Sequence, residues 1–391
     1  MKCPTCTNTA CTPLLTLSTA VMFLVCGCVS VPSKLPDWME PGVRKGADFL
    51  VKDAFIEDKR LGTVTDIAFG ELDANPGLEV GVAGPRRALL ASRNGELIRW
   101  VGFKKKRRIG DLFRTYRDFE IVDVENDGVC EFFSMASWTS ACGLFDHEGN
   151  KIWSRGFMLN TSAYGDVDAD GKLEFVLSRY KMLALVDSKG GVRWQRNDAP
   201  FHLVSLHVFD INRDGKAEIV GTEWDKITVM DAEGNMDRQT RSKIDGIFLG
   251  DASLVRYPTE HSRAYFFCVA KSSYLLVSLG GNAIIREFQG TGSSVRPIAT
   301  PVRFDSDEEP YFAIFGMLPW QGSKTMGFEA LHSVLFVFDP EQNLVYLEVI
   351  DDDARAIATA PSGKPNEEVL LVGGTGKVWR YRTATNNDPD S

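Results

Sequence analysis

Four short acidic loops carry the residues whose types and spacing could do chemistry. Each loop has side-chain oxygens at positions one, three and five and a glutamate at position nine, and three of the four have glycine at position six. The predicted ligands are Asp166, Asp168, Asp170, Lys172 and Glu174 in the third loop; Asp210, Asn212, Asp214, Lys216 and Glu218 in the fourth; Asp123, Glu125, Asp127, Val129 and Glu131 in the second; and Glu71, Asp73, Asn75 and Glu79 in the first.

This pattern can surround one hard cation, with position seven contributing its backbone carbonyl. An all-oxygen ligand set favours calcium, whereas magnesium needs a smaller octahedral site and zinc prefers nitrogen or sulfur. An EF-hand is excluded, because position twelve is Leu177 in the third loop and Gly221 in the fourth. The first loop has Pro76 at the glycine position, and we expect it to bind more weakly.

The alternative is that Asp, Asn and Gly are only good turn formers, whose side chains bond to nearby backbone amides without an ion. Against this, converging carboxylates repel one another. A turn that serves structure alone would rarely repeat this arrangement in consecutive units. We therefore predict Ca²⁺ as the cofactor, bound by the second, third and fourth loops above all.

The elements around these loops form a repeat. Each loop joins two apolar strands, which begin the units at Ile67, Phe119, Ser162 and Leu206, and a hairpin with a tight turn follows, with later hairpins at Leu275 and Val334. A repeat of about 45 residues is the size of one propeller blade. Short strands separated by Gly, Asn and Asp turns indicate an all-β fold. We predict a single β-propeller of about seven four-stranded antiparallel blades over residues 47–383, with six or eight blades as alternatives.

The last unit is one strand short before the polar tail of residues 384–391. The segment from Ala47 could supply that strand, so that pairing of the N- and C-terminal strands closes the ring and removes exposed sheet edges. Tryptophans that recur after the hairpin turns are predicted to pack between blades: Trp100, Trp153, Trp194 and Trp379. Tryptophans outside that register are candidates for a ligand surface: Trp138, Trp224 and Trp320.

The N-terminus is typical of an export signal. The apolar stretch Leu14–Val25 is too short to span a membrane. The sequence Val25-Cys26-Gly27-Cys28 resembles the lipobox of bacterial lipoproteins, which makes residues 1–27 a signal peptide and Cys28 the lipidated residue. Residues 28–46 form a proline-containing tether. We expect an outer-membrane or periplasmic lipoprotein of the cell envelope that contacts membrane only through this lipid; simple secretion is the alternative.

Charge and cysteine content limit the partners further. The formal net charge of -9 argues against a nucleic-acid partner. The basic run Lys104–Arg108 is expected to be a solvated loop. Cys130 and Cys142 flank one hairpin, but their offset is unsuitable for direct opposition, and we expect no disulfide between them.

The acidic loops resemble those of FG-GAP and VCBS-type repeat propellers, whose blades carry DxDxDG followed by an acidic residue three positions on. Asp166–Glu174 has this pattern, and Phe69-Gly70 and Tyr164-Gly165 stand where the FG of the name falls. The resemblance implies structural calcium that rigidifies the loops, and a role in adhesion or ligand recognition.

Two classes of function remain open. One is a non-catalytic propeller that binds a protein or glycan ligand at one face. The other is an enzyme similar to propeller polysaccharide lyases or quinone-dependent dehydrogenases. The chain has no serine elbow or phosphate loop, and its five histidines lack metal spacing. We therefore favour binding over catalysis.

Overall fold

The computed structural model describes residues 42, 44–72, 79–84, 88–101, 116–136, 141–156, 159, 161–179, 181–197, 203–211, 214–244, 247–257, 260–270, 273–278, 283–289, 295–305, 309–319 and 330–385. A compact unit spanning Val31–Ser391 contains all of them. No helix in these ranges is long and apolar enough to cross a membrane.

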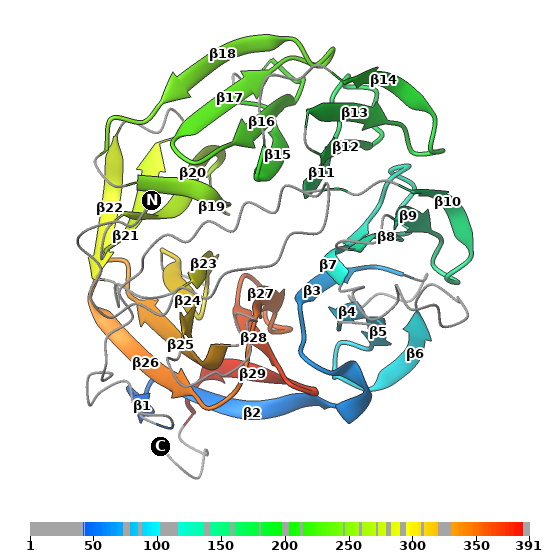
Figure 1. The fold of residues 1–391 in the computed structure, drawn as a ribbon. Helices are drawn as coiled ribbons and strands as arrows, with labels where there is room; N and C mark the ends of the chain where they lie inside the picture. The colour runs from blue at the N-terminus through cyan, green and yellow to red at the C-terminus, as the bar shows by residue number, and fades with distance from the viewer. Residues whose placement is uncertain are drawn as a thin grey trace, which may run out of the picture. The chain divides into compact units, whose positions relative to one another are not determined.

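Seven antiparallel sheets, built from the described residues, surround a common centre like the blades of a propeller (Figure 1). Blades 1 to 4 consist, from the inner strand outward, of β3 (Asp66–Gly70), β4 (Glu79–Ala83), β5 (Ala88–Ala91) and β6 (Leu97–Val101); β7 (Tyr116–Val122), β8 (Glu131–Ala136), β9 (Ala141–Phe145) and β10 (Lys151–Arg155); β11 (Thr161–Gly165), β12 (Glu174–Arg179), β13 (Met182–Val186) and β14 (Val192–Arg196); and β15 (Ser205–Phe209), β16 (Glu218–Thr222), β17 (Lys226–Met230) and β18 (Met236–Arg241).

Blades 5 to 7 follow the same order. They consist of β19 (Ile247–Tyr257), β20 (Glu260–Ala270), β21 (Ser273–Ser278) and β22 (Ile284–Gln289); β23 (Val295–Val302), β24 (Tyr311–Pro319), β25 (Ala330–Phe338) and β26 (Leu344–Ile350); and β27 (Ala356–Pro361), β28 (Glu368–Gly374), β29 (Lys377–Thr383) and β2 (Leu50–Glu57). The predicted seven-bladed, all-β propeller is confirmed.

Blade 7 closes the ring as the sequence predicts. Its outer strand β2 pairs antiparallel with β29, from Leu50 opposite Thr383 to Glu57 opposite Lys377. The short strand β1 (Arg44–Lys45) adds a fifth strand to blade 6 by pairing with β26. This addition was not anticipated, because residues 44 and 45 lie in the segment interpreted as a tether and have no apolar pattern.

Apolar side chains fill the wedges between neighbouring blades. Between blades 3 and 4, for example, Val176 and Leu183 pack with Leu206 and Val208 in one buried cluster. The recurring tryptophans pack in these wedges as predicted. Trp100, Trp194 and Trp379 are partly buried against the clusters. The indole of Trp153 is 7% exposed and lies in the cluster between blades 2 and 3.

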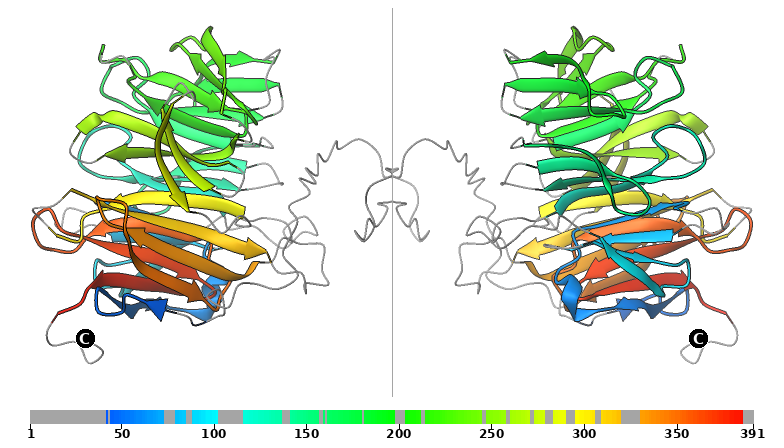
Figure 2. Two further views of the ribbon diagram at one scale, coloured as in Figure 1. Left: turned by 90° about the vertical axis from the view of Figure 1, so that its left-hand side faces the viewer. Right: turned by 90° about the vertical axis from the view of Figure 1, so that its right-hand side faces the viewer.

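The antiparallel order of the strands fixes which loops share a face of the ring. The loop between the first and second strand of a blade and the turn between its third and fourth strand lie at the same end of the sheet. The strands run between the two faces in the side views of Figure 2. The acidic loops and the hairpin turns therefore lie on one face, here called the acidic face, and the loops between second and third strands lie on the opposite face.

Candidate metal centre

The second, third and fourth acidic loops have one hydrogen-bonding pattern. The aspartate at position one accepts hydrogen bonds from the backbone amides of positions five and six. These bonds join Asp123 to Asp127 and Gly128 at 3.0 and 2.8 Å, Asp166 to Asp170 and Gly171 at 3.1 and 2.9 Å, and Asp210 to Asp214 and Gly215 at 3.2 and 2.8 Å. Bonds of this kind are also what acidic turns make without an ion.

Position seven lies inside each turn. The backbone amides of Val129, Lys172 and Lys216 donate hydrogen bonds to the position-five aspartates at 3.0, 2.9 and 2.9 Å. The glycine at position six adopts φ near +86° in the third loop. A Cβ there would meet nothing within 4 Å, so backbone conformation and not space favours glycine at this position.

The glutamate at position nine reaches back beneath its loop. It accepts a hydrogen bond from the backbone amide of position two in all four loops, at 2.8 Å for Glu79, 3.0 Å for Glu131, 3.0 Å for Glu174 and 2.8 Å for Glu218. The position-two side chains Val124 and Val167 are fully buried. Each loop is thus fixed to the core at one end and to the first residue of the second strand at the other.

Backbone hydrogen bonds also join the loops of neighbouring blades. The amide of Cys130 donates to the carbonyl of Glu71 at 2.8 Å, that of Leu173 to Val124 at 2.9 Å, and that of Ala217 to Asp166 at 3.3 Å. The four loops therefore form a continuous arc on the acidic face. A shift of one loop would therefore disturb its backbone hydrogen bond to the next loop.

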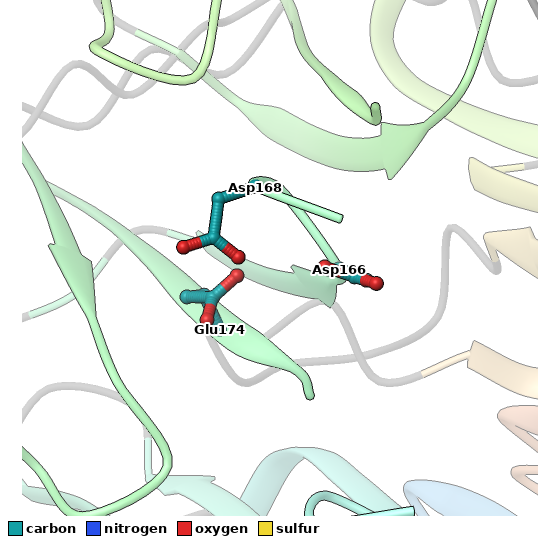
Figure 3. A group of neighbouring side chains, drawn as sticks. All are labelled: Asp166, Asp168 and Glu174. Carbon is teal, nitrogen blue, oxygen red and sulfur yellow. The ribbon is translucent and has the colours of Figure 1, made fainter. Parts of the chain in front are cut away.

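The third loop brings its carboxylates together. One oxygen from each of Asp166, Asp168 and Glu174 lies within 4.8 Å of the others, and the carboxylates of Asp168 and Glu174 face each other in Figure 3. Oxygens on opposite sides of a calcium ion are about 5 Å apart, because each Ca–O distance is about 2.5 Å. The donor set and spacing of this loop therefore fit calcium.

The electrostatics of Glu174 also suit a cation. Burial raises the pKa of Glu174 to about 7, against the hydrogen bond from the Val167 amide and the charge of Arg193, which lower it. The neighbouring carboxylates of Asp168 and Asp170 raise the pKa further. A cation among these groups would favour the ionised form.

The other predicted ligand sets are not brought together to the same degree. Among the residues that the structure describes, only the third loop places three carboxylate oxygens within 4.8 Å. In the second loop, Glu125 instead forms an ion pair with Lys172 of the next blade, and this hydrogen bond lowers the pKa of Glu125. Asp73, Asn75 and Asn212 lie outside the described residues.

Two cationic side chains contact the acidic loops in a way that the sequence analysis did not predict. Lys172 was assigned only a backbone role, yet its Nζ bonds to Glu125. Arg193 on β14 bonds to Asp168, and its Nη2 lies 3.0 Å from Glu174 Oε1 and 3.7 Å from Asp170 Oδ2. One sequence signal points to Arg193: it directly precedes Trp194 in the third hairpin.

Of the ligand-surface candidates, the structure describes only Trp224, which lies away from these loops. Trp224 follows β16 on the opposite face, and its side chain is 39% exposed. Trp138, Trp320 and Cys28 lie outside the described residues.

A cavity of about 340 Å³ lies between blades 7 and 1, and sequence reasoning did not find it. Its apolar wall includes Phe55, Phe69 and Val80, and Arg93 and Arg380 contribute guanidinium groups. The Arg380 group is already held by both oxygens of Asp53, at 3.0 Å each. The cavity therefore presents an apolar wall with two arginines beside it, of which Arg380 is paired with Asp53.

Fold and site together define a seven-bladed β-propeller with a row of acidic loops on one face. No family model and no curated protein matches the sequence. Similarity to solved structures is extensive but limited to the fold.

The WD40 domain of Pan2 from Neurospora crassa is 11% identical with a TM-score of 0.53, over 86% of this chain and 96% of that one. BBS1N, solved in complex with ARL6DN, is 8% identical with a TM-score of 0.56, over 90% and 100%. A streptogramin B lyase is 8% identical with a TM-score of 0.54, over 86% and 98%. At these identities the likeness shows the propeller fold alone.

Proposed function

We propose that this protein is a non-catalytic, calcium-stabilised binding propeller of the FG-GAP and VCBS type, exported to the cell envelope and held there by a lipid on Cys28. The observation that carries the calcium proposal is the convergence of Asp166, Asp168 and Glu174 in a loop whose backbone pattern recurs in two neighbouring blades. Calcium in these loops stabilises the arc of loops on the acidic face.

The proposed ligand is a protein or a glycan bound at one face of the ring. A protein ligand is supported by the neighbours, since BBS1N was solved in complex with a protein partner, ARL6DN. The alternative of a propeller enzyme is supported by the similarity in fold to a streptogramin B lyase. We favour binding, because the three converging carboxylates of the third loop have the ligand types of a cation site and not those of an acid–base pair.

A thermal melt of the purified full-length protein tests the calcium proposal. We expect the melting temperature to rise in a saturable way between excess EDTA and millimolar calcium, because only binding to the native state stabilises it. At a calcium concentration of 100 times Kd, each site adds about 2.7 kcal/mol. Magnesium at the same concentration is the control. Identical melts in EDTA and calcium would exclude the proposal.

Lipidation is tested separately, by mass spectrometry of the mature N-terminus. We expect a mature chain that begins at Cys28 and carries acyl groups, and a Cys28→Ser variant that stays unprocessed. An unmodified N-terminus elsewhere in the leader would favour simple secretion.

A further inference from the structure

The outer strands of the blades contain a β-bulge at one recurring position. In blade 3, Val192 pairs with Val186 and Trp194 pairs with Leu185, which leaves Arg193 as the extra residue. The same shift leaves Ile152 unpaired in blade 2 and Asp237 unpaired in blade 4. Bulges re-aim a side chain relative to the regular strand. The bulge lies just after the hairpin turn, on the acidic face.

In blade 3 this bulge places a cation inside the acidic loop. The Arg193 guanidinium bonds to Asp168, lies 3.0 Å from Glu174 and lies 3.7 Å from Asp170. Two of these residues, Asp168 and Glu174, belong to the converging carboxylate group. The planar guanidinium can donate to several carboxylate oxygens at once. Arg193 therefore supplies positive charge to the oxygens that a calcium ion would need.

We propose that Arg193 is the built-in counter-cation of the third loop, and that Arg193 and calcium are alternative occupants of it. The inference rests on the proposed calcium function and deepens it. A divalent ion and a guanidinium repel one another when they share the same carboxylates. Calcium must therefore displace Arg193, and the apparent affinity falls by the fraction of molecules in which Arg193 has left the loop.

This arrangement lowers the calcium affinity of the third loop below what its ligand count alone predicts. The third loop has four carboxylates at its ligand positions, as many as the second, yet among blades 2 to 4 it is the loop whose bulge residue is a cation. The corresponding bulge residue is apolar Ile152 in blade 2 and acidic Asp237 in blade 4. Neither bulge side chain can act as a counter-cation, and the second loop has instead the pair of Lys172 with its single ligand Glu125. In the wild-type protein the third loop is thus held together without metal, and it binds calcium more weakly than its ligands imply.

Calcium titration by isothermal calorimetry on the full-length chain tests the inference, with the wild type, Arg193→Gln and Arg196→Gln compared. Arg196 is the matched control, because it lies on the same strand but bonds to Asn235 of the next blade. If Arg193 occupies the loop in more than nine molecules of ten, Arg193→Gln should bind calcium at one site about tenfold more tightly or better. Adding Asp168→Ala, which removes the oxygen ligand at position three, to Arg193→Gln should abolish that gain and so assign it to the third loop.

A second measurement needs no metal. In EDTA, Arg193→Gln should melt at a lower temperature than Arg196→Gln, because three carboxylates lose their counter-charge. If the wild type binds calcium but the isotherm and EDTA melt of Arg193→Gln match those of Arg196→Gln, the inference is overturned and the proposed function stands. If no variant binds calcium, both the proposed function and the competition are overturned.

Discussion

The Nε1 of Trp153 in blade 2 donates a hydrogen bond of 3.0 Å to the carbonyl oxygen of Ser188 in blade 3. Trp194 makes the equivalent bond of 2.8 Å to Ala232 in blade 4. Each ring therefore packs in the wedge and also attaches its blade to the hairpin turn of the next one. This link runs along the acidic face beside the arc of acidic loops.

Replacing Trp153 tests the energetic weight of this link. Trp153→Ala should destabilise the protein by about 3–5 kcal/mol, because it removes a large buried side chain and leaves a cavity. Trp153→Phe should cost less, since it retains most of the apolar area but loses the bond to Ser188. Urea unfolding measures both. Trp224→Ala is the control and should change stability by less than about 0.5 kcal/mol, because that side chain is 39% exposed. Equal losses for Trp153→Ala and Trp224→Ala would contradict the role of Trp153 as a link between blades.

The hairpin turn that receives Trp153 requires glycine for two reasons. Gly190 has φ of +82°, and a Cβ there would lie 2.6 Å from Cγ of Trp153. Gly190→Ala should cost about 3 kcal/mol, from left-handed backbone strain and the displaced indole. Gly42→Ala separates the two effects, because Gly42 also has φ of +82° but a Cβ there meets nothing within 4 Å. In urea unfolding we expect the Gly42 variant to lose no more than about 2 kcal/mol; a loss as large as that of Gly190→Ala would mean that the indole contact contributes nothing.

The repeat made the fold predictable from the sequence. The contacts between repeat units were not predictable. The loops align by sequence alone, and the missing strand of the last unit indicated that the segment from Ala47 closes the ring. The side-chain contacts of Arg193 and Lys172 were not predicted from the sequence, because they depend on how strands pair and how neighbouring blades are placed. The bulge at Arg193 is defined only by the pairing of β13 with β14, and Lys172 contacts a loop that lies 47 residues earlier.

The ring-closing strand β2 is also joined to blade 6 by an ion pair. Lys52 on β2 lies 2.6 Å from Glu348 on β26, and Tyr346 donates a hydrogen bond of 2.8 Å to the same carboxylate. Glu348→Gln should cost about 3 kcal/mol in the free energy of unfolding, because it leaves the largely buried Lys52 without its counter-charge.

Chemical denaturation at neutral pH checks the closure prediction against Glu367→Gln. Glu367 pairs with Lys364 at 2.9 Å, but the lysine side chain is 70% exposed. Exposed pairs contribute less than about 1 kcal/mol, so this control should remain close to the wild type. Similar losses for the two variants would show that Glu348 has no special part in closure.

Glu368 gives a pH dependence that is separate from the acidic loops. Burial raises the pKa of Glu368 above its ordinary value of 4.5, against the Arg303 amide and charge, which lower it. Between 4.5 and this raised pKa, the folded protein binds more protons than the unfolded chain, so stability falls as pH rises. The stability contributed by protonated Glu368 is complete below pH 4.5 and is lost as pH rises through the folded pKa.

Glu368→Gln removes this titration and keeps an oxygen that can accept the Arg303 amide bond of 2.8 Å. The free energy of unfolding of the variant, relative to the wild type, should therefore increase from pH 4.5 upward and then level off. Urea unfolding in EDTA across this range measures the difference. A difference that stays constant with pH would show that Glu368 titrates at its ordinary value in the folded state.

The buried thiols report on the packing between neighbouring blades. Cys130, Cys142 and Cys268 are free and buried. Burial raises the pKa of Cys130 to about 11 and those of Cys142 and Cys268 to about 12. Since the thiolate is the nucleophile, iodoacetamide at pH 7.5 should leave all three unmodified in the native protein and label all three in guanidinium. Peptide mass spectrometry resolves the sites. On prolonged exposure of the folded protein, Cys130 should be labelled before the other two, because its pKa is the lowest and it is the most exposed of the three, at 9%. Rapid native labelling of Cys268 would contradict the packed interface between blades 4 and 5 in which it lies.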